Sequence, residues 1–312
     1  MISDGTPRLV DAHLHVWNPA TASYPWLTPD LTVLDRAFAM ADAEPDLSEL
    51  GAQAVVLVQA ADNLADTANL FAQAARDPRV AGVVAWVPLD RPDEAARLLD
   101  DWRDSPAPVV GVRHLIHREP DPDWLIGPAV ADGLELLAAR GLSFDVCAEN
   151  PALLAHVPVL AARHPGLRLV VDHLAKPPLA ALRSGRRTAW REWCALITDA
   201  AAAPGVVAKI SGLNTAAGPG WEVGDLRPAV EHALEVFGPD RLMVGSDWPF
   251  ALLEATSYRH AFAAVLAIAG ELEPGARDAV LAGTAERTYF PGRPRAGEPP
   301  ATNRKNVSPP CP

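Results

Sequence analysis

The strongest constraint on the fold of this chain is an alternation between short apolar runs of β-strand type and longer segments with helical periodicity. Eight runs are rich in Val, Ile and Leu, and several, such as AVVLV at 54–58, are almost continuously apolar. Continuous runs of this kind are typical of strands in a parallel sheet that is covered on both faces. The eight predicted strands lie at 9–15, 53–59, 80–88, 109–116, 142–147, 167–173, 206–211 and 242–247.

The segments between these runs have the length and pattern of crossover helices. Apolar residues recur at a spacing of three to four in the segments 63–76, 93–102, 128–140, 151–163, 190–202, 226–237 and 257–269. Gly141 and Gly238 follow two of them as helix stops. Eight β-then-α units favour a single-domain (β/α)8 TIM barrel over a doubly wound open sheet. No GxGxxG motif follows the first strand and no P-loop occurs in the sequence, so nothing in it predicts a nucleotide cofactor.

Composition sets the domain boundaries and the classes of partner. With 49% apolar residues among 312, the chain can bury a large core, and we assign residues 1–290 to the barrel. Residues 291–312 are rich in Pro and polar side chains without apolar periodicity, which predicts a disordered tail. The net charge of −12 argues against nucleic acid and anionic membranes as partners.

Cysteine content and the ends of the chain indicate where the protein works. Cys147, Cys194 and Cys311 are too few and too scattered for a disulfide framework, which favours a reducing compartment. The first residues lack the pattern of a signal peptide, and no apolar run is long enough to span a membrane. We therefore expect a cytoplasmic protein, and whether it forms a homo-oligomer stays open.

Polar residues at the predicted strand ends are the candidates for an active site, because barrel enzymes place their chemistry at the carboxyl ends of the strands. The first strand ends in DAHLH, and side-chain alternation points His13 and His15 in the same direction, into the barrel mouth. His173 ends the sixth strand and Asp247 the eighth. A carboxylate at an apolar strand end is costly to bury without a partner. We expect these three imidazoles and one carboxylate to form one site.

Further polar and aromatic residues lie near the same predicted mouth. Arg113 and His114 end the fourth strand and Lys209 lies near the end of the seventh, while Trp26 and Trp248 are candidate walls. A histidine at a strand end is more often structural than functional, which applies to His114 and to His117. Asp11 and Asp172 are expected to support the site or to anchor loops.

Seven motifs in order carry a resemblance to a known family. They are DAHLHVWNP at 11–19, YPWL at 24–27, GVRHLIHREPDPDWL at 111–125, GLSFDVCAE at 141–149, DHLAKPP at 172–178, KISGL at 209–213 and GPDRLMVGSDWP at 238–249. Together they resemble the amidohydrolase superfamily, and more closely its branch of sugar-lactone and pyrone-dicarboxylate lactonases. The resemblance covers about 9 to 289, nearly the whole predicted barrel.

The resemblance implies a role for each strand-end residue. His13, His15, His173 and Asp247 would be the catalytic set, with Arg113 and Lys209 on a polar substrate; His114, Trp26 and Trp248 complete the predicted substrate site. Binuclear members of the superfamily use a carboxylated lysine after the fourth strand and a histidine after the fifth. This chain has Arg113 and His114 at the one and residues 145–149 at the other, as in the lactonase branch, which argues against a two-metal site.

The chemistry expected from these residues is the opening of a lactone. Asp247 would take a proton from water and return it to the leaving ring oxygen. The imidazoles would polarise the carbonyl as hydrogen-bond donors, or through one zinc or manganese ion held by His13, His15, His173 and Asp247. The metal-independent and mononuclear forms both stay open.

The expected substrate is an aldonolactone such as an L-fucono- or L-rhamnonolactone, because tryptophans at the mouth can stack on a sugar ring. Three alternatives stay open. A carboxylated lactone of the pyrone or muconolactone type would use further cations such as Lys176 and Arg118. A metal-dependent decarboxylase of the same superfamily would release carbon dioxide, and a barrel that has lost catalysis would only bind its ligand.

Overall fold

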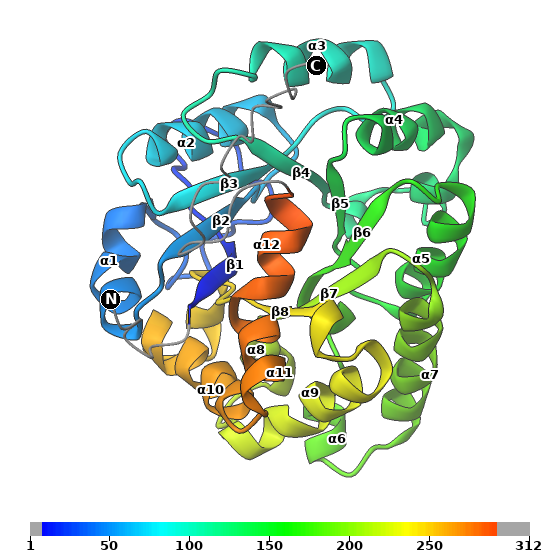
Figure 1. Cartoon of the computed structure of the whole chain (residues 1–312). Coiled ribbons are helices and arrows are strands. Elements are labelled where there is room, and N and C mark those ends of the chain that lie inside the picture. Colours follow the sequence, from blue (N-terminus) through cyan, green and yellow to red (C-terminus); the bar gives the residue numbers. More distant parts are fainter. Residues whose placement is uncertain (1–7, 292–312) are drawn as a thin grey trace, which may run out of the picture.

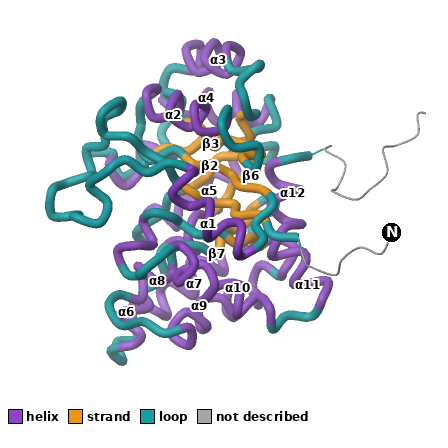
Figure 2. The backbone as a smooth tube through the Cα atoms, turned by 90° about the vertical axis from the view of Figure 1, so that its left-hand side faces the viewer, coloured by secondary structure: helices purple, strands orange, loops and turns teal. Residues whose placement is uncertain are grey.

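Eight parallel strands form the centre of the structure, a computed structural model that describes residues 8–291. Each strand pairs with the next in chain order, and helices surround the strands on the outside (Figures 1 and 2). The strands are β1 (Val10–Leu14), β2 (Ala54–Val58), β3 (Val80–Ala85), β4 (Val109–His114), β5 (Ser143–Val146), β6 (Arg168–Val171), β7 (Val206–Ile210) and β8 (Leu242–Val244). The predicted single-domain (β/α)8 barrel is confirmed.

All seven predicted helices are present: α2 (Leu64–Ala74), α3 (Pro92–Asp101), α4 (Pro128–Ala139), α5 (Pro151–Arg163), α7 (Thr188–Ala202), α9 (Val223–Phe237) and α10 (Tyr258–Gly270). Within residues 8–291, five more helices were not predicted: α1 (Met40–Leu50), α6 (Leu179–Arg183), α8 (Leu213–Ala217), α11 (Pro274–Asp278) and α12 (Thr284–Tyr289). Pro45 lies inside α1, and the other four have only five or six residues, too few to show a helical period.

The observed strands stop earlier than predicted at their carboxyl ends. β6 ends at Val171 and β8 at Val244, whereas the predicted runs continue to His173 and Asp247. The backbone at both of these residues has a left-handed φ, of 54° and 56°, which ends an extended strand. The apolar pattern therefore locates each strand but not the bend at which the functional loop begins.

The ring closes where the chain after β8 returns beside β1. A parallel bridge joins Leu14 to Trp248, and the backbone N–H of Asp247 donates to the carbonyl of His13 over 2.8 Å. Gly245 permits this approach, because a Cβ there would lie only 2.6 Å from the Cβ of His13. The closing seam therefore places Asp247 directly beside the end of β1.

The amino-terminal end of the barrel is covered by α12 (Figures 1 and 2). Ala285 and Tyr289 of this helix belong to the same buried cluster as Val56 and Val110 from the strands. The Tyr289 hydroxyl also donates to Asp145 Oδ2 over 2.7 Å. In Figure 2 the long loops extend at the opposite end from α12, on the left. One end of the barrel is therefore plugged, and the other carries the loops.

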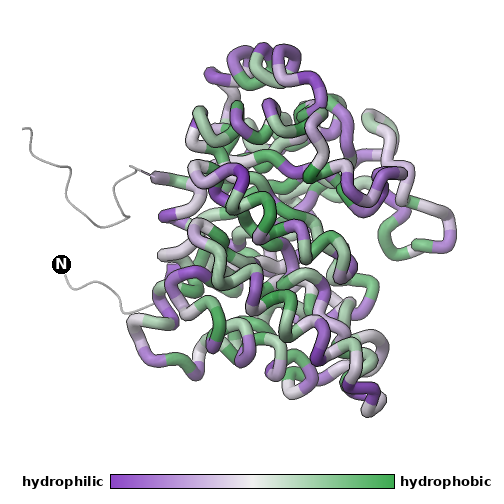
Figure 3. The backbone as a smooth tube through the Cα atoms, turned by 90° about the vertical axis from the view of Figure 1, so that its right-hand side faces the viewer, coloured by the Kyte–Doolittle hydropathy of each residue, from purple (hydrophilic) through white to green (hydrophobic). Residues whose placement is uncertain are grey.

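The main hydrophobic core lies between the strands and the surrounding helices. It joins strand residues such as Leu57 and Leu169 to helix residues such as Leu70 and Leu160. Figure 3 shows apolar stretches in the middle of the molecule and many hydrophilic stretches along its outline. Among the described residues, no helix has both the length and the hydropathy needed to cross a membrane. The tail predicted at 291–312 lies, apart from its first residue, outside the described residues.

Candidate active site

Three imidazoles and one carboxylate meet beyond the carboxyl ends of β1, β6 and β8. The Oδ1 atom of Asp247 lies 3.9 Å from His13 Nε2, 3.6 Å from His15 Nε2 and 3.7 Å from His173 Nε2. The Nε2 atoms of His13 and His15 are 3.0 Å apart. All four side chains are buried. The structure thus brings together the four residues that the strand ends and the resemblance predicted as one set.

A left-handed turn after β6 carries His173 into this site. Its four successive residues with left-handed φ, between 50° and 56°, are His173, Leu174, Ala175 and Lys176. This conformation costs an L-residue about 1–2 kcal/mol, so the surrounding structure must hold it. The side chain of Leu174 is fully buried, and its carbonyl accepts a hydrogen bond of 2.8 Å from the indole N–H of Trp193. The turn is therefore anchored to α7.

Gly212, directly after β7, makes room for the carboxylate of Asp247. A Cβ at this glycine would lie 2.3 Å from Asp247 Oδ2 and 3.1 Å from His173 Nδ1, and its φ of +59° is left-handed. The Lys176 ammonium lies 3.8 Å from the same Oδ2 atom. Close packing and backbone conformation both require glycine here.

Hydrogen bonds at Nδ1 orient two of the rings. His15 Nδ1 donates to the carbonyl of Val58 over 2.8 Å, which leaves the lone pair of the neutral ring on Nε2. His173 Nδ1 lies 2.8 Å from the hydroxyl of Ser211. Outer partners of this kind fix ring orientation at metal and acid–base sites. Both Nε2 atoms are thereby turned toward Asp247.

The third ring, that of His13, contacts a group of charged side chains inside the barrel. Its Nδ1 atom lies 3.2 Å from Asp172 Oδ1 and 3.0 Å from Lys209 Nζ. Lys209 also contacts Asp145 Oδ2 over 2.6 Å and Asp172 Oδ1 over 3.1 Å. None of these charges is isolated, as burial requires. His13 is thus positioned by residues from β5, β7 and the end of β6.

Lys209, predicted as a substrate contact, has protein partners inside the barrel. The side chain is 0% exposed and its ammonium is paired with two carboxylates. Asp172, predicted as a supporting group, contacts Lys209 and His13 directly. Asp145 and Lys209 are separated by 64 positions in the chain, which is why no local pattern signals their pairing.

Burial sets the protonation of the site. It lowers the pKa of His13, His15 and His173, the last to about 3, so all three rings are neutral at pH 7. Burial alone would raise the pKa of Asp247, but the positive charge of the Lys176 ammonium nearby opposes this effect, and the pKa lies below its usual range. The site therefore combines neutral imidazoles with an ionised carboxylate.

These residues suit a single divalent ion. His13, His15 and Asp247 offer ligand atoms within 4.8 Å of one another, and neutral imidazole and ionised carboxylate are the forms that bind metal. Within the described residues, Asp247 Oδ2 is buried without a hydrogen-bond partner, as is typical of a site completed by another group. These three side chains can thus hold one ion such as zinc or manganese.

Arg113 lies between the site and the charged group beneath it. Its NH1 atom donates to Asp172 Oδ2 over 3.1 Å and lies 3.4 Å from His13 Nε2. Its NH2 atom donates to the carbonyl of Gln59 over 2.6 Å. The guanidinium is therefore beside the reacting groups, while its Nε remains buried without a partner among the described residues.

The predicted substrate residue His114 has protein partners on both ring nitrogens. Its Nε2 atom lies 2.7 Å from Glu119 Oε1, and its Nδ1 atom accepts a hydrogen bond of 3.1 Å from the indole of Trp86. The ring stacks on Trp124 with a centroid distance of 4.3 Å. These contacts fit a residue that shapes the loops after β4.

The two predicted tryptophan walls differ in exposure. Trp26 is half-buried, donates to the carbonyl of Ala60 over 2.7 Å, and packs with a ring distance of 4.7 Å on Phe250. Phe250 in turn lies 5.3 Å from the ring of His15, which connects Trp26 to the site. Trp248 is 3% exposed, so it supports the site from within the core.

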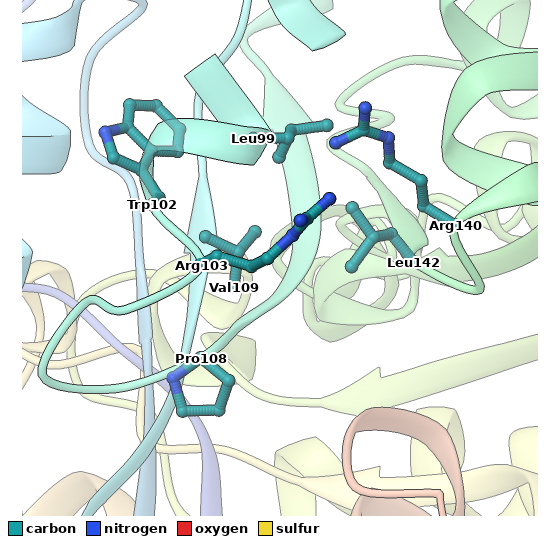
Figure 4. Close-up of a pocket in the computed structure, with 7 residues that line it drawn as sticks. All are labelled: Leu99, Trp102, Arg103, Pro108, Val109, Arg140 and Leu142. Atoms are coloured by element: carbon teal, nitrogen blue, oxygen red, sulfur yellow. The ribbon is translucent and has the colours of Figure 1, made fainter. Parts of the chain in front are cut away.

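A cavity of about 400 Å³ lies at the opposite end of the barrel (Figure 4). It is lined by Leu99, Trp102, Arg103, Pro108, Val109, Arg140 and Leu142. Val109 begins β4 and Leu142 precedes β5, so the cavity faces the amino-terminal side of the strands. Its two guanidinium groups already share Asp100 Oδ1, over 3.0 and 2.9 Å. The cavity therefore does not compete with the histidine site as the place of chemistry.

A (β/α)8 barrel with two histidines at the end of its first strand and an aspartate after its last has polar groups where barrel enzymes place their chemistry. The chain belongs to the amidohydrolase family, whose sequence profile matches residues 10–290. This finding agrees with the resemblance carried by the seven motifs.

Curated relatives narrow the family. The chain is 37% identical over 247 residues to an L-fucono-1,5-lactonase of Burkholderia ambifaria, covering 78% of this chain and 81% of the relative. It is 36% identical over 287 residues to an L-fucono-1,5-lactonase of Burkholderia multivorans, covering 90% and 95%.

Solved structures show the same fold. An amidohydrolase from Burkholderia multivorans crystallised with bound HEPES matches with a TM-score of 0.82 and 34% identity, over 90% of this chain and 99% of that one. A second crystal form with bound zinc matches with a TM-score of 0.81, 34% identity and the same coverage.

Proposed function

We propose that this protein is a lactonase that hydrolyses a sugar lactone. The observation that carries the proposal is the convergence of Asp247 with three imidazole Nε2 atoms, each within 3.9 Å of its Oδ1. Two relatives at 36% and 37% identity that bear the name L-fucono-1,5-lactonase support the substrate class. The same names favour ester hydrolysis over decarboxylation.

In the proposed mechanism, Asp247 acts on the water. Its carboxylate accepts a proton as the water attacks the lactone carbonyl and then returns this proton to the ring oxygen as that oxygen leaves. The low pKa of Asp247 makes it a weak base, so its contribution comes mainly from positioning the water. The closing seam and Gly212 hold the carboxylate for this purpose.

The imidazoles His13, His15 and His173, with Asp247, would hold one divalent ion, as the zinc-bound structural relative suggests. Such an ion supplies Lewis-acid polarisation of the carbonyl. The chain's own contribution is to keep the three rings neutral and their Nε2 atoms aimed at one point.

Substrate recognition is proposed for Arg113 and Trp26. The guanidinium of Arg113 lies beside His13 and can donate to the hydroxyl or carbonyl oxygens of a sugar lactone. The half-buried ring of Trp26, connected to the site through Phe250, offers a face for a sugar ring. His114 and Trp248 would pack behind the residues that contact the substrate.

A pH-indicator screen of five- and six-membered aldonolactones tests the function. We expect the wild type to open at least one of them and the Asp247→Asn variant to lose about two to four orders of magnitude in kcat, because the amide cannot accept the proton. Circular dichroism serves as the folding control. Equal rates for both proteins would remove Asp247 from the mechanism. If the wild type releases acid from none of the lactones, the proposed function is wrong.

A further inference from the structure

We propose that His117, Cys147 and Glu149 form a second metal site, which takes a borderline-soft divalent cation of the zinc and cobalt class. His117 lies on a single helical turn, η1 (Ile116–Arg118), after β4, whereas Cys147 directly follows β5 and Glu149 comes two residues later. One ligand atom from each of the three lies within 4.8 Å of the other two. Two successive strand ends therefore bring an imidazole, a thiol and a carboxylate together.

Hydrogen bonding leaves this group incomplete. The Nδ1 atom of His117 is buried and has no hydrogen-bond partner in the part of the chain that the structure describes. Within this cluster, the thiol of Cys147 donates a weak hydrogen bond of 3.9 Å to Glu149 Oε1. An unsatisfied buried nitrogen costs about 1–3 kcal/mol, and a metal ion bound by these atoms would remove that cost.

The donor set selects the kind of ion. Thiolate and imidazole are preferred by zinc and similar ions, whereas magnesium and calcium prefer oxygen ligands only. The thiolate of Cys147 and the carboxylate of Glu149 would neutralise the two positive charges of the ion. The nearby Arg113, whose charge interacts with Cys147, therefore does not oppose the loaded site. Glu149 is exposed, which leaves a path from solvent.

A relay of the Cys–His–Glu type does not fit this geometry. In such a relay the thiol and the carboxylate bind opposite nitrogens of one imidazole, each over about 2.6–3.2 Å, which holds the two outer atoms on opposite sides of the ring. Here Sγ of Cys147 and Oε1 of Glu149 are only 3.9 Å apart. The three groups surround a point, as metal ligands do.

This site is separate from the one built on Asp247. The two groups have no residue in common, since the first uses His13, His15, His173 and Asp247. We therefore propose the second as a separate site, and this proposal does not rest on the lactonase activity.

Cobalt titration of the full chain, after chelation and dialysis, tests the proposal. We expect near-ultraviolet thiolate-to-cobalt charge-transfer absorption in the wild type and its loss in Cys147→Ser. The matched control is Cys194→Ser, which changes a half-buried thiol on α7 and should keep the absorption, as should Cys311→Ser. His117→Asn and Glu149→Gln should weaken cobalt binding by about tenfold or more.

The Asp247→Asn variant separates the two sites, because it should lose lactone hydrolysis and keep the thiolate absorption. Circular dichroism checks that each variant is folded. If Cys147→Ser does not fold, the weaker cobalt binding expected of His117→Asn tests the same site through another ligand. The proposal is overturned if folded wild-type protein shows no thiolate absorption, if Cys147→Ser retains it, or if His117→Asn and Glu149→Gln bind cobalt as tightly as the wild type.

Discussion

Two carboxylates and two cations form a buried charged group next to His13. Lys209 is fully buried between Asp145 and Asp172, with Arg113 on the far side of Asp172. Buried charges in such a group depend on one another, because each one removed leaves another unpaired. We therefore expect Lys209 to hold His13 and the barrel interior together.

Replacement of Lys209 by Met should lower the free energy of unfolding by about 3–5 kcal/mol, because two buried carboxylates lose their shared partner. Urea denaturation measures this loss. A contact with the substrate, in contrast, would leave stability unchanged and raise KM, so that result would contradict the assignment. Arg97→Met, which removes a cation on α3 away from the site, is the control.

Substitution of Gly212 by Ala should disable the site with only a local structural effect. The new Cβ would lie 2.3 Å from Asp247 Oδ2, and the left-handed φ of +59° is unfavourable for alanine. We expect kcat/KM to fall by about a hundredfold or more, since small displacements of a catalytic group have effects of that size. Gly220→Ala, at a φ of +65° with open space around it, separates backbone strain from the clash.

At the level of elements, the loops after the strands carry the site and are themselves anchored by helices. The left-handed turn that bears His173 is tied to α7 through Trp193. The long loop after β1 is tied to the start of α2 through Asp66, which accepts hydrogen bonds from Tyr24 and from the backbone of Ala60. The helices thus set the positions of loops that apolar periodicity does not describe.

Asp66 gives this anchor a dependence on pH. Burial raises its pKa from 3.8 to about 6, so the folded state binds its proton more tightly than the unfolded state. Its contribution to stability is therefore largest below pH 4 and is lost as the pH rises through 6. When the pH is lowered from 7 to 4, the free energy of unfolding of the wild type should rise by up to about 3 kcal/mol relative to that of Asp66→Asn. Urea denaturation at the two pH values measures this difference. A constant difference between the two proteins would contradict this assignment.

For the whole molecule, closure of the barrel is the step that assembles the site. The residues that meet at Asp247 come from positions 13, 15 and 173, and only the return of the last strand to the first brings them together. Gly245 allows this return at the seam. Any ion held across the seam would therefore stabilise the closed ring.

Metal binding at this seam should raise thermal stability. In a Cys147→Ser background, which removes the second proposed site, zinc at about a hundred times its Kd should add about 2.7 kcal/mol to the free energy of unfolding. Differential scanning calorimetry of chelated and zinc-loaded protein measures the corresponding rise in Tm. The additional change His15→Ala should abolish the rise, and an equal rise with this variant would place the ion elsewhere.

The chain's periodicity determined the barrel, and the residues at its strand ends determined which side chains would meet. Both are local properties: an apolar run specifies a strand, alternation specifies its faces, and parallel strands share one functional end. The sequence therefore predicts one shared site at the carboxyl ends of the strands for His13, His15, His173 and Asp247.

Only the tertiary structure decided which of these groups pair with one another. Lys209 pairs with Asp145 and Asp172, His114 pairs with Glu119, and the cluster of His117, Cys147 and Glu149 forms across two loops. These pairings depend on where each loop bends after its strand and on the closing of the ring. Neither is encoded in the period of apolar residues, because both arise from contacts between segments far apart in the chain.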